Sequence, residues 1–270
     1  MSKVHELTEQ LTGQPAPTAK KPLPTTIKGM LSDKRYLNQI QAALPKHMTT
    51  ERVSRIALTE IRKNQMLGQC DPLTLFGAVI QSAQLGLEIG SGLGHAYLIP
   101  FRNNKANRVD VQFIIGFRGM IDLARRSGQI VSLQAHAIYE GDEFDFAYGI
   151  EERLHHVPTR DVQKKGPMIG VYAIAKLIGG GHQVEVMWKS EVDQVRSQSK
   201  GRNSGPWTNH YEEMAKKTVI RRLFKYLPVS VEIQRATILD ELAEAGESQE
   251  HGEIFDHADI LEGEFNQEPN

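Results

Sequence analysis

The chain has 270 residues, of which 40% are hydrophobic and 24% charged, and its formal net charge is −1. It is long enough to bury one sizeable core, and no run approaches the ~18 consecutive apolar residues of a membrane span. The N-terminus lacks the apolar region of a secretory signal, and the single cysteine, Cys70, excludes an intrachain disulfide or a multi-cysteine zinc site. These features predict a cytoplasmic protein.

Charge is unevenly distributed along the chain. Residues 239–270 contain eleven acids and no Lys or Arg, so positions 1–238 carry about +10. A basic body with an acidic tail is typical of DNA-binding proteins. The tail is expected to be partly helical and then disordered. At this stage it could compete with phosphates, dock a partner, or only solubilise the chain.

The N-terminal third is predicted to be a flexible arm followed by helices. Residues 1–33 hold four prolines and few bulky apolar residues, which predicts the arm. Apolar residues at helical spacing then predict three helices: Asp33–Leu44, one from Thr49, and one from Pro72 to Leu87. Asp71 before Pro72 is an N-cap followed by proline at the first helical position.

The pattern changes to strands after Gly90. The segments predicted as strands are Ala96–Phe101, Val109–Gly116, Ile130–Tyr139, Glu143–Tyr148, Met168–Ile178 and Gln183–Trp188. Further helices are expected at Phe117–Ser127, Lys189–Ser197, Pro206 to about Tyr226, and Val229 to about Ala245. Helices around a mainly antiparallel meander of hairpins make the fold class α+β. The predicted organisation is an arm (1–33), a folded core (34–238) and the acidic tail (239–270).

The segment Glu213–Tyr226 is the most informative about function. On a helical wheel, Val219, Ile220, Leu223 and Phe224 share one side. The opposite side holds Lys217, Arg221, Arg222 and Lys225, whereas Lys216 projects towards the apolar side. Lys217, Arg221 and Lys225 step by four and form one ridge of like charges. No acid follows Glu213 in this helix, so a polyanion such as the phosphates of DNA would relieve the repulsion. A merely solvated basic face is the alternative.

Three more basic clusters flank the predicted strands: the hairpin loop after Phe101, the helix after Gly116, and Lys200 to Arg202 before Trp207. Aromatic residues are interleaved with them, which is how proteins hold single strands without reading sequence. Trp207 is the best candidate for stacking on a base, because it lies in a polar Gly-Pro-Trp turn. The predicted DNA-binding residues are Lys105, Arg108, Arg118, Arg125, Arg126, Lys200, Arg202, Trp207, Lys216, Lys217, Arg221, Arg222 and Lys225.

Enzymatic readings find little support. The chain has no G-x-x-x-x-G-K-[ST] segment, which argues against a P-loop ATPase. The acids Asp142, Glu143 and Asp145 could hold Mg²⁺ as in a nuclease, although they also fit a turn and the polar face of a strand. No catalytic residue, metal or cofactor is therefore expected, with Mg²⁺ considered only as a modulator of DNA binding.

Several of these segments are similar to the RecT family of phage-encoded recombinases. They are LGHAYLIPF, IIGFRGMIDLARRSGQI, GDEFDF and GPWTNHYEEMAKKTVIRRLFKYLPVSVEIQRA, and the resemblance covers roughly Leu31 to Ala236. The Red beta branch resembles the chain more distantly, in the Gly-Pro-Trp turn and the basic helix. Trp207, Lys216 and Lys225 match positions where that branch has a DNA-contacting tryptophan or basic residues. Thr218 stands where it has a lysine, a role that Lys217 would take over.

The resemblance implies ATP-independent binding of single-stranded DNA and annealing of complementary strands in homologous recombination. It implies a ring or filament of identical subunits and a 5′→3′ exonuclease partner, with a single-strand-binding protein of the host as a further expected partner. We expect the last basic helix and the Arg118–Arg126 helix to line one positive groove, with the Lys105/Arg108 hairpin at its rim. A nuclease and a passive single-strand-binding protein are the alternatives.

Overall fold

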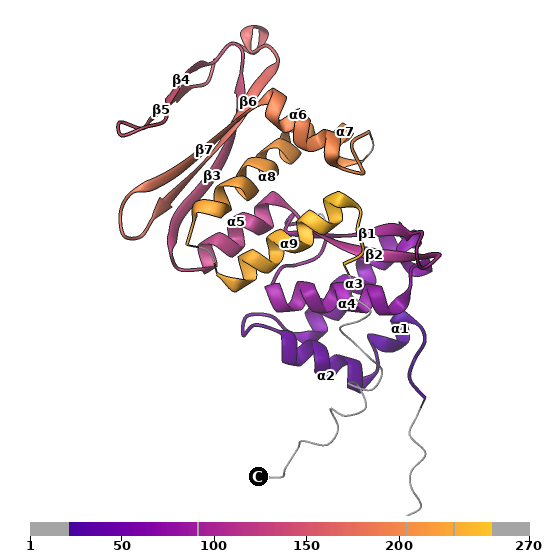
Figure 1. Ribbon diagram of the computed structural model, residues 1–270. Coiled ribbons are helices and arrows are strands. Elements are labelled where there is room, and N and C mark those ends of the chain that lie inside the picture. Colours follow the sequence, from indigo (N-terminus) through magenta and orange to yellow (C-terminus); the bar gives the residue numbers. More distant parts are fainter. Residues whose placement is uncertain (1–21, 91, 204, 229, 250–270) are drawn as a thin grey trace, which may run out of the picture.

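The computed structural model describes residues 22–90, 92–203, 205–228 and 230–249. Helices and antiparallel strands are combined in one fold, which confirms the α+β class (Figure 1). The α-helices are α1 (Ile27–Met30), α2 (Lys34–Ala43), α3 (Thr50–Lys63), α4 (Pro72–Leu85), α5 (Phe117–Arg126), α6 (Lys189–Gln198), α7 (Pro206–Asn209), α8 (Tyr211–Leu223) and α9 (Val231–Ala245). The strands are β1 (Ala96–Asn103), β2 (Arg108–Ile115), β3 (Ile130–Tyr139), β4 (Glu143–Ala147), β5 (Arg153–Val157), β6 (Met168–Leu177) and β7 (His182–Trp188). Short 3₁₀ turns are η1 (Gln65–Gln69), η2 (Val162–Lys164) and η3 (Phe224–Tyr226).

Helix α4 is the centre of the N-terminal half. Its apolar residues face every direction and almost all of them are buried, as expected for a helix surrounded by other elements. The Asp71 side chain caps its first turn by accepting from the backbone N–H groups of Leu73 and Thr74. Gly86 ends it in the left-handed conformation. Helices α1 and α2 and strand β2 pack around it.

The predicted flexible arm extends too far towards the C-terminus. Residues 22–33 include α1, whose Ile27 and Met30 are buried in the main core together with Leu31. Ordered structure therefore begins before the predicted boundary at residue 33. The remainder of the predicted arm lies outside the described residues.

The C-terminal half is built on a three-stranded antiparallel sheet with the order β3-β6-β7. Helix α8 packs on one face (Figure 1), with α5 and α6 beside it. On the other face the β4–β5 hairpin covers a smaller core of Ile138, Tyr172, Val184 and Val186. The expected meander is thus incorrect in one respect: β3 pairs with β6, and β4 pairs with β5, a strand not predicted from the sequence.

The last helices also differ from expectation. The helix predicted from Pro206 to Tyr226 is interrupted at His210, whose backbone leaves the helical conformation (φ −141°, ψ 49°), so α7 and α8 are separate. Helix α9 runs through the predicted boundary between the core and the acidic tail, and Leu239 and Asp240 are buried. The folded part therefore continues to Gln249, and the disorder predicted for the rest of the tail lies outside the described residues. Among the helices that the structure describes, none has the length and apolar character needed to cross a membrane.

Candidate nucleic-acid interface

Two of the three cations of the predicted basic ridge form ion pairs inside the fold. Lys217 is 4% exposed, and its ammonium pairs with the carboxylate of Asp240 in α9, which is completely buried. Arg221 pairs with the same carboxylate at 3.2 Å and with Glu244 at 2.7 Å. Two acids of α9 thus neutralise Lys217 and Arg221, whereas Lys225, the third residue of the ridge, is exposed in η3. Our prediction that these two cations face a groove for DNA is therefore wrong for the fold as it stands.

The other basic residues of α8 are also paired. Lys216 lies 2.6 Å from Glu212, one turn earlier on its own helix. Arg222 bridges two elements, with Glu185 of β7 at 2.6 Å and Glu191 of α6 at 2.8 Å. Burial raises the pKa of Glu185, and the neighbouring Arg222 guanidinium opposes that rise. These residues hold α8 against the sheet, although the Arg222 side chain stays 43% exposed.

Trp207 is part of the core. It is 2% exposed and lies against Tyr211 with a ring-centroid distance of 5.9 Å. Neither face of the indole is open to a base in this conformation, so the predicted stacking role is not supported by its position. Tyr226 in η3, in contrast, is 64% exposed and follows the exposed Lys225. It is a better placed aromatic side chain for stacking.

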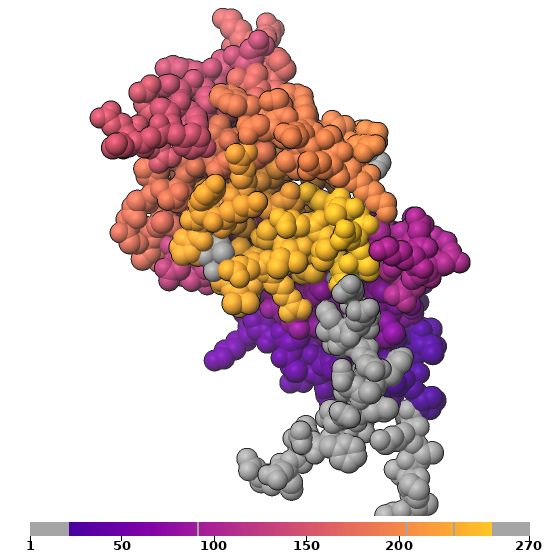
Figure 2. Space-filling view, in the orientation of Figure 1, coloured from indigo at the N-terminus to yellow at the C-terminus, as the bar shows by residue number. Residues whose placement is uncertain are grey.

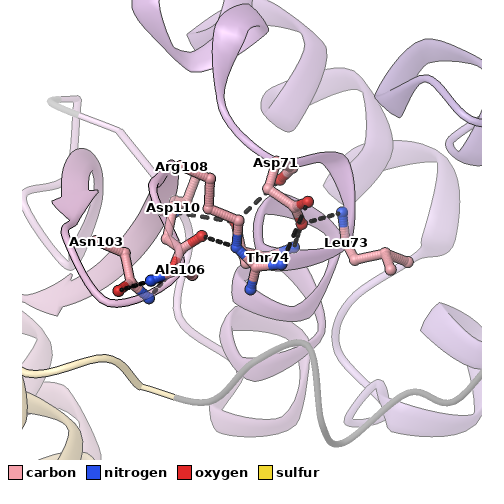
Figure 3. Close-up of polar contacts among 8 residues, drawn as sticks. Asp71, Leu73, Thr74, Asn103, Ala106, Arg108 and Asp110 are labelled. Carbon is pink, nitrogen blue, oxygen red and sulfur yellow. Dashed lines mark hydrogen bonds and ion pairs between the residues drawn. The ribbon is translucent and has the colours of Figure 1, made fainter.

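The β1–β2 hairpin carries the first accessible group of cations. Lys105 lies in its exposed turn, and Lys200 lies over the ring of Phe101 at 4.4 Å from the centroid. Together with Arg102 and Arg108 they line a cleft of about 720 Å³ between the hairpin, the start of α4 and residues 246–249. Arg108 is occupied by Asp110 at 2.6 Å and Asp71 at 3.7 Å (Figure 3). Among the described residues, the other three have no carboxylate within ion-pairing distance.

Helix α5 and the turn after α8 carry further accessible cations. Arg118, Arg125 and Lys225 are exposed, and none forms an ion pair with a described residue. Arg126 differs, because it pairs with Asp122 at 2.9 Å and donates to the carbonyl of Leu85 at the end of α4. Its role is at least partly structural.

Arg202 lies in the loop before α7. It is exposed, and its guanidinium donates to the carbonyl of Ser197 at 3.3 Å, while its own carbonyl accepts from Arg196. Among the described residues it has no carboxylate partner, so its charge is accessible. Lys200 and Arg202 therefore stay in the predicted interface with unpaired charges.

The accessible cations form separate groups instead of one groove. Lys200 lies at the C-terminal end of α9, since its backbone N–H donates to the carbonyl of Glu244. Lys225 precedes the N-terminal end of the same helix, where the charge of Glu232 interacts with that of Arg126 at the end of α5. The 15 residues of α9 separate these two ends by roughly 22 Å. Figure 2 shows α9, in yellow, at the surface of the molecule.

The acids considered for a metal site do not come together. Both oxygens of the buried Asp142 carboxylate are used, by the backbone N–H groups of Thr159 (2.9 Å) and Tyr139 (2.8 Å) and by the His156 ring (3.1 Å). Asp145 pairs instead with Arg153 across the β4–β5 ladder. In the described ranges, no group of three His, Cys, Asp or Glu residues could hold a metal ion. The cluster anchors the β4–β5 hairpin.

The hydrogen bonds of Asp142 also act on its ionisation. Burial raises the pKa of this carboxyl group, but the two backbone donors and His156 outweigh burial and hold the pKa below its usual value. On its other ring nitrogen, His156 contacts the hydroxyl of Tyr172 in β6 at 3.1 Å. The chain Asp142–His156–Tyr172 therefore connects the hairpin to the sheet.

The chain is similar to known proteins over most of its length. The model of the RecT family matches residues 51–254. The chain is 53% identical over 235 residues to Protein RecT of Escherichia coli K12, which covers 86% of each chain. It is 31% identical over 238 residues to the uncharacterized protein YqaK of Bacillus subtilis, covering 88% of this chain and 78% of that protein.

Proposed function

Because this chain belongs to the RecT family and is therefore a DNA-binding recombination protein, we propose that it anneals complementary single strands of DNA without ATP. The observation that carries the proposal is the 53% identity to Protein RecT over most of both chains. The absence of a P-loop segment from the sequence agrees with ATP independence.

Annealing requires that the bases stay available to a second strand. We propose that exposed cations grip the phosphates, and that sequence is read only by base pairing. The residues proposed for this contact are those with accessible charge: Lys105, Arg118, Arg125, Lys200, Arg202 and Lys225. Tyr226 is the proposed stacking side chain next to Lys225. Binding should weaken steeply as salt rises, because each phosphate contact releases counterions.

The proposed assembly, partners and location follow from the family resemblance. We propose a ring or filament of identical subunits, so that the separate cation groups of neighbouring copies continue one another along the strand. A 5′→3′ exonuclease that exposes the strand, a single-strand-binding protein of the host and a cytoplasmic location complete the proposal. Mg²⁺ would act on DNA binding only, without a cofactor site in the protein.

A fluorescence assay with two complementary labelled oligonucleotides tests the proposal. The full chain should speed pairing relative to protein-free DNA, without ATP and in EDTA as well as in Mg²⁺. A passive coat would slow pairing, and a nuclease would shorten the labelled strand on a denaturing gel in Mg²⁺. Either of those results would reject annealing as the function.

A further inference from the structure

The cleft beside the β1–β2 hairpin lies where the acidic end of the chain leaves the fold. Gly246 ends α9 in the left-handed conformation (φ 69°) and packs against the Lys200 side chain. A side chain at this position would meet that of Lys200, and the positive φ itself favours glycine. Residues 246–249 then form one wall of the cleft.

Gln249 fixes the exit point. It is 5% exposed, and its side-chain amide donates to the carbonyls of Phe113 (2.9 Å) and Leu239 (2.6 Å). Its side-chain oxygen accepts from the backbone N–H of Phe113 at 2.7 Å. The amide thus pairs with both backbone groups of Phe113, as a neighbouring strand would. Gln112 adds a hydrogen bond to the carbonyl of Glu247 at 3.0 Å.

The cleft offers positive charge that the fold does not use. Three acids line the cleft: Asp71 caps α4, Asp110 accepts from both Arg108 and Asn103 (Figure 3), and Glu247 is exposed on the opposite wall. The charges of Arg102, Lys105 and Lys200 have no carboxylate partner among the described residues. The four cations of the cleft outnumber its three acids, and two of those acids are already engaged, so the cleft favours an anionic ligand.

The next 21 residues of the same chain have the complementary charge. Residues 250–270 contain seven acids and no Lys or Arg: Glu250, Glu253, Asp256, Asp259, Glu262, Glu264 and Glu268. Even fully extended, they reach no farther than about 70 Å from Gln249. Their tethering gives them an effective concentration on the order of millimolar at a site beside the anchor.

We infer that residues 250–270 bind the Arg102/Lys105/Lys200 cleft and compete there with the phosphates of single-stranded DNA. This inference rests on the proposed function for its DNA-binding half, but the contact between tail and cleft does not depend on it. The competition acts as a threshold: DNA displaces the tail only where several phosphates bind together. Surface ion pairs are individually weak and are screened by salt, so the contact is reversible.

The contact is tested first without DNA. A carbodiimide that joins carboxylates to lysines should couple tail peptides to Lys105 and Lys200 in the full chain at 50 mM salt, as detected by mass spectrometry. Lys34 and Lys176, which are exposed and unpaired on other parts of the described structure, are the matched controls. Equal coupling to all four lysines, or none to the cleft pair, overturns the inference whatever the protein does to DNA.

The competition is tested by DNA affinity. Fluorescence anisotropy with a labelled oligo(dT) compares the full chain with a variant whose seven tail acids are replaced by their amides. The neutral tail should tighten binding roughly tenfold at 50 mM salt, the factor expected if three cations are each released from a surface-strength ion pair. The gain should disappear in a Lys105→Gln, Lys200→Gln background. An unchanged affinity, or an equal gain in both backgrounds, contradicts competition, whereas failure of every variant to bind DNA contradicts the proposed function.

Discussion

The internal ion pairs between α8 and α9 give the sharpest prediction for stability. Asp240 is completely buried and contacts both Lys217 and Arg221. Removing one partner of a buried pair leaves an uncompensated charge, which costs about 3–5 kcal/mol. Lys217→Met should therefore lower the free energy of unfolding by about 3 kcal/mol, toward the lower limit because Arg221 remains beside Asp240. Domains are typically stable by only about 5–15 kcal/mol, so the loss is large.

Reversing both charges should destabilise the fold more than Lys217→Met does. Lys217→Glu with Arg221→Glu would place four carboxylates together, because Glu244 also lies in this network. We expect that variant to lose cooperative unfolding altogether. The compensated variant Lys217→Met with Asp240→Leu removes both charges and leaves Arg221 paired with Glu244, so it should recover most of the stability.

Urea unfolding followed by circular dichroism measures these differences. The matched control is Lys105→Glu with Lys225→Glu, two exposed cations without an ion pair among the described residues, which should change stability by no more than about 0.5 kcal/mol. If Lys217→Glu with Arg221→Glu unfolds at the same urea concentration as the unaltered chain, then α8 presents its ridge to solvent and the packing described above is incorrect.

Three further predictions concern single positions. Trp207→Ala should destabilise the fold by about 3–5 kcal/mol because the ring is buried. Tyr226→Ala should leave the thermal midpoint unchanged and weaken binding to oligo(dT), because its ring is exposed. The reverse pattern would support Trp207 as the stacking residue. Gln249→Ala should lower the free energy of unfolding in urea by roughly 2 kcal/mol, because the backbone N–H and carbonyl of Phe113 would stay buried without these partners. Amide exchange at Phe113 should increase, and unchanged exchange would show that Gln249 does not hold the chain there. The depressed pKa of Asp142 means that its carboxylate stabilises the fold above the unfolded pKa of about 3.9, and that this contribution is lost as pH falls through the lower folded pKa. Asp142→Asn should accordingly reduce the acid sensitivity of unfolding, and an identical pH profile would show that the carboxylate contributes nothing.

Local patterns in the sequence were sufficient to predict most elements. Helices α2, α3 and α4 begin directly after Asp33, Thr49 and Asp71, close to their predicted starts, and Asp71 caps α4 as predicted. The glycines before His182 form the β6–β7 turn. Strand β5 was missed because RLHHV lacks the β-branched and aromatic enrichment of a strand, and its alternation becomes visible only against β4. The break at His210 depends on packing of α7 and has no local signal.

The prediction that the basic ridge of α8 faces DNA was wrong for a different reason. A helical wheel describes one helix, and the acids that neutralise Lys217 and Arg221 arrive from a helix that begins at Val231. A signal did exist: Asp240 and Glu244 are four residues apart, the same spacing as the two cations. Assigning those acids to a separate tail concealed the match. Trp207 was misread similarly, since a polar turn in sequence can still be covered by the rest of the fold.

The central claim is that exposed, unpaired cations hold the phosphates of single-stranded DNA. The most direct measurement is the salt dependence of oligo(dT) binding for the unaltered chain and for Lys105→Gln, Arg125→Gln, Lys225→Gln. Each lost phosphate contact should lower the slope of log affinity against log salt by about 0.7, so the triple variant should lose about 2 while keeping its thermal midpoint. An unchanged slope in a folded triple variant would show that DNA is held elsewhere.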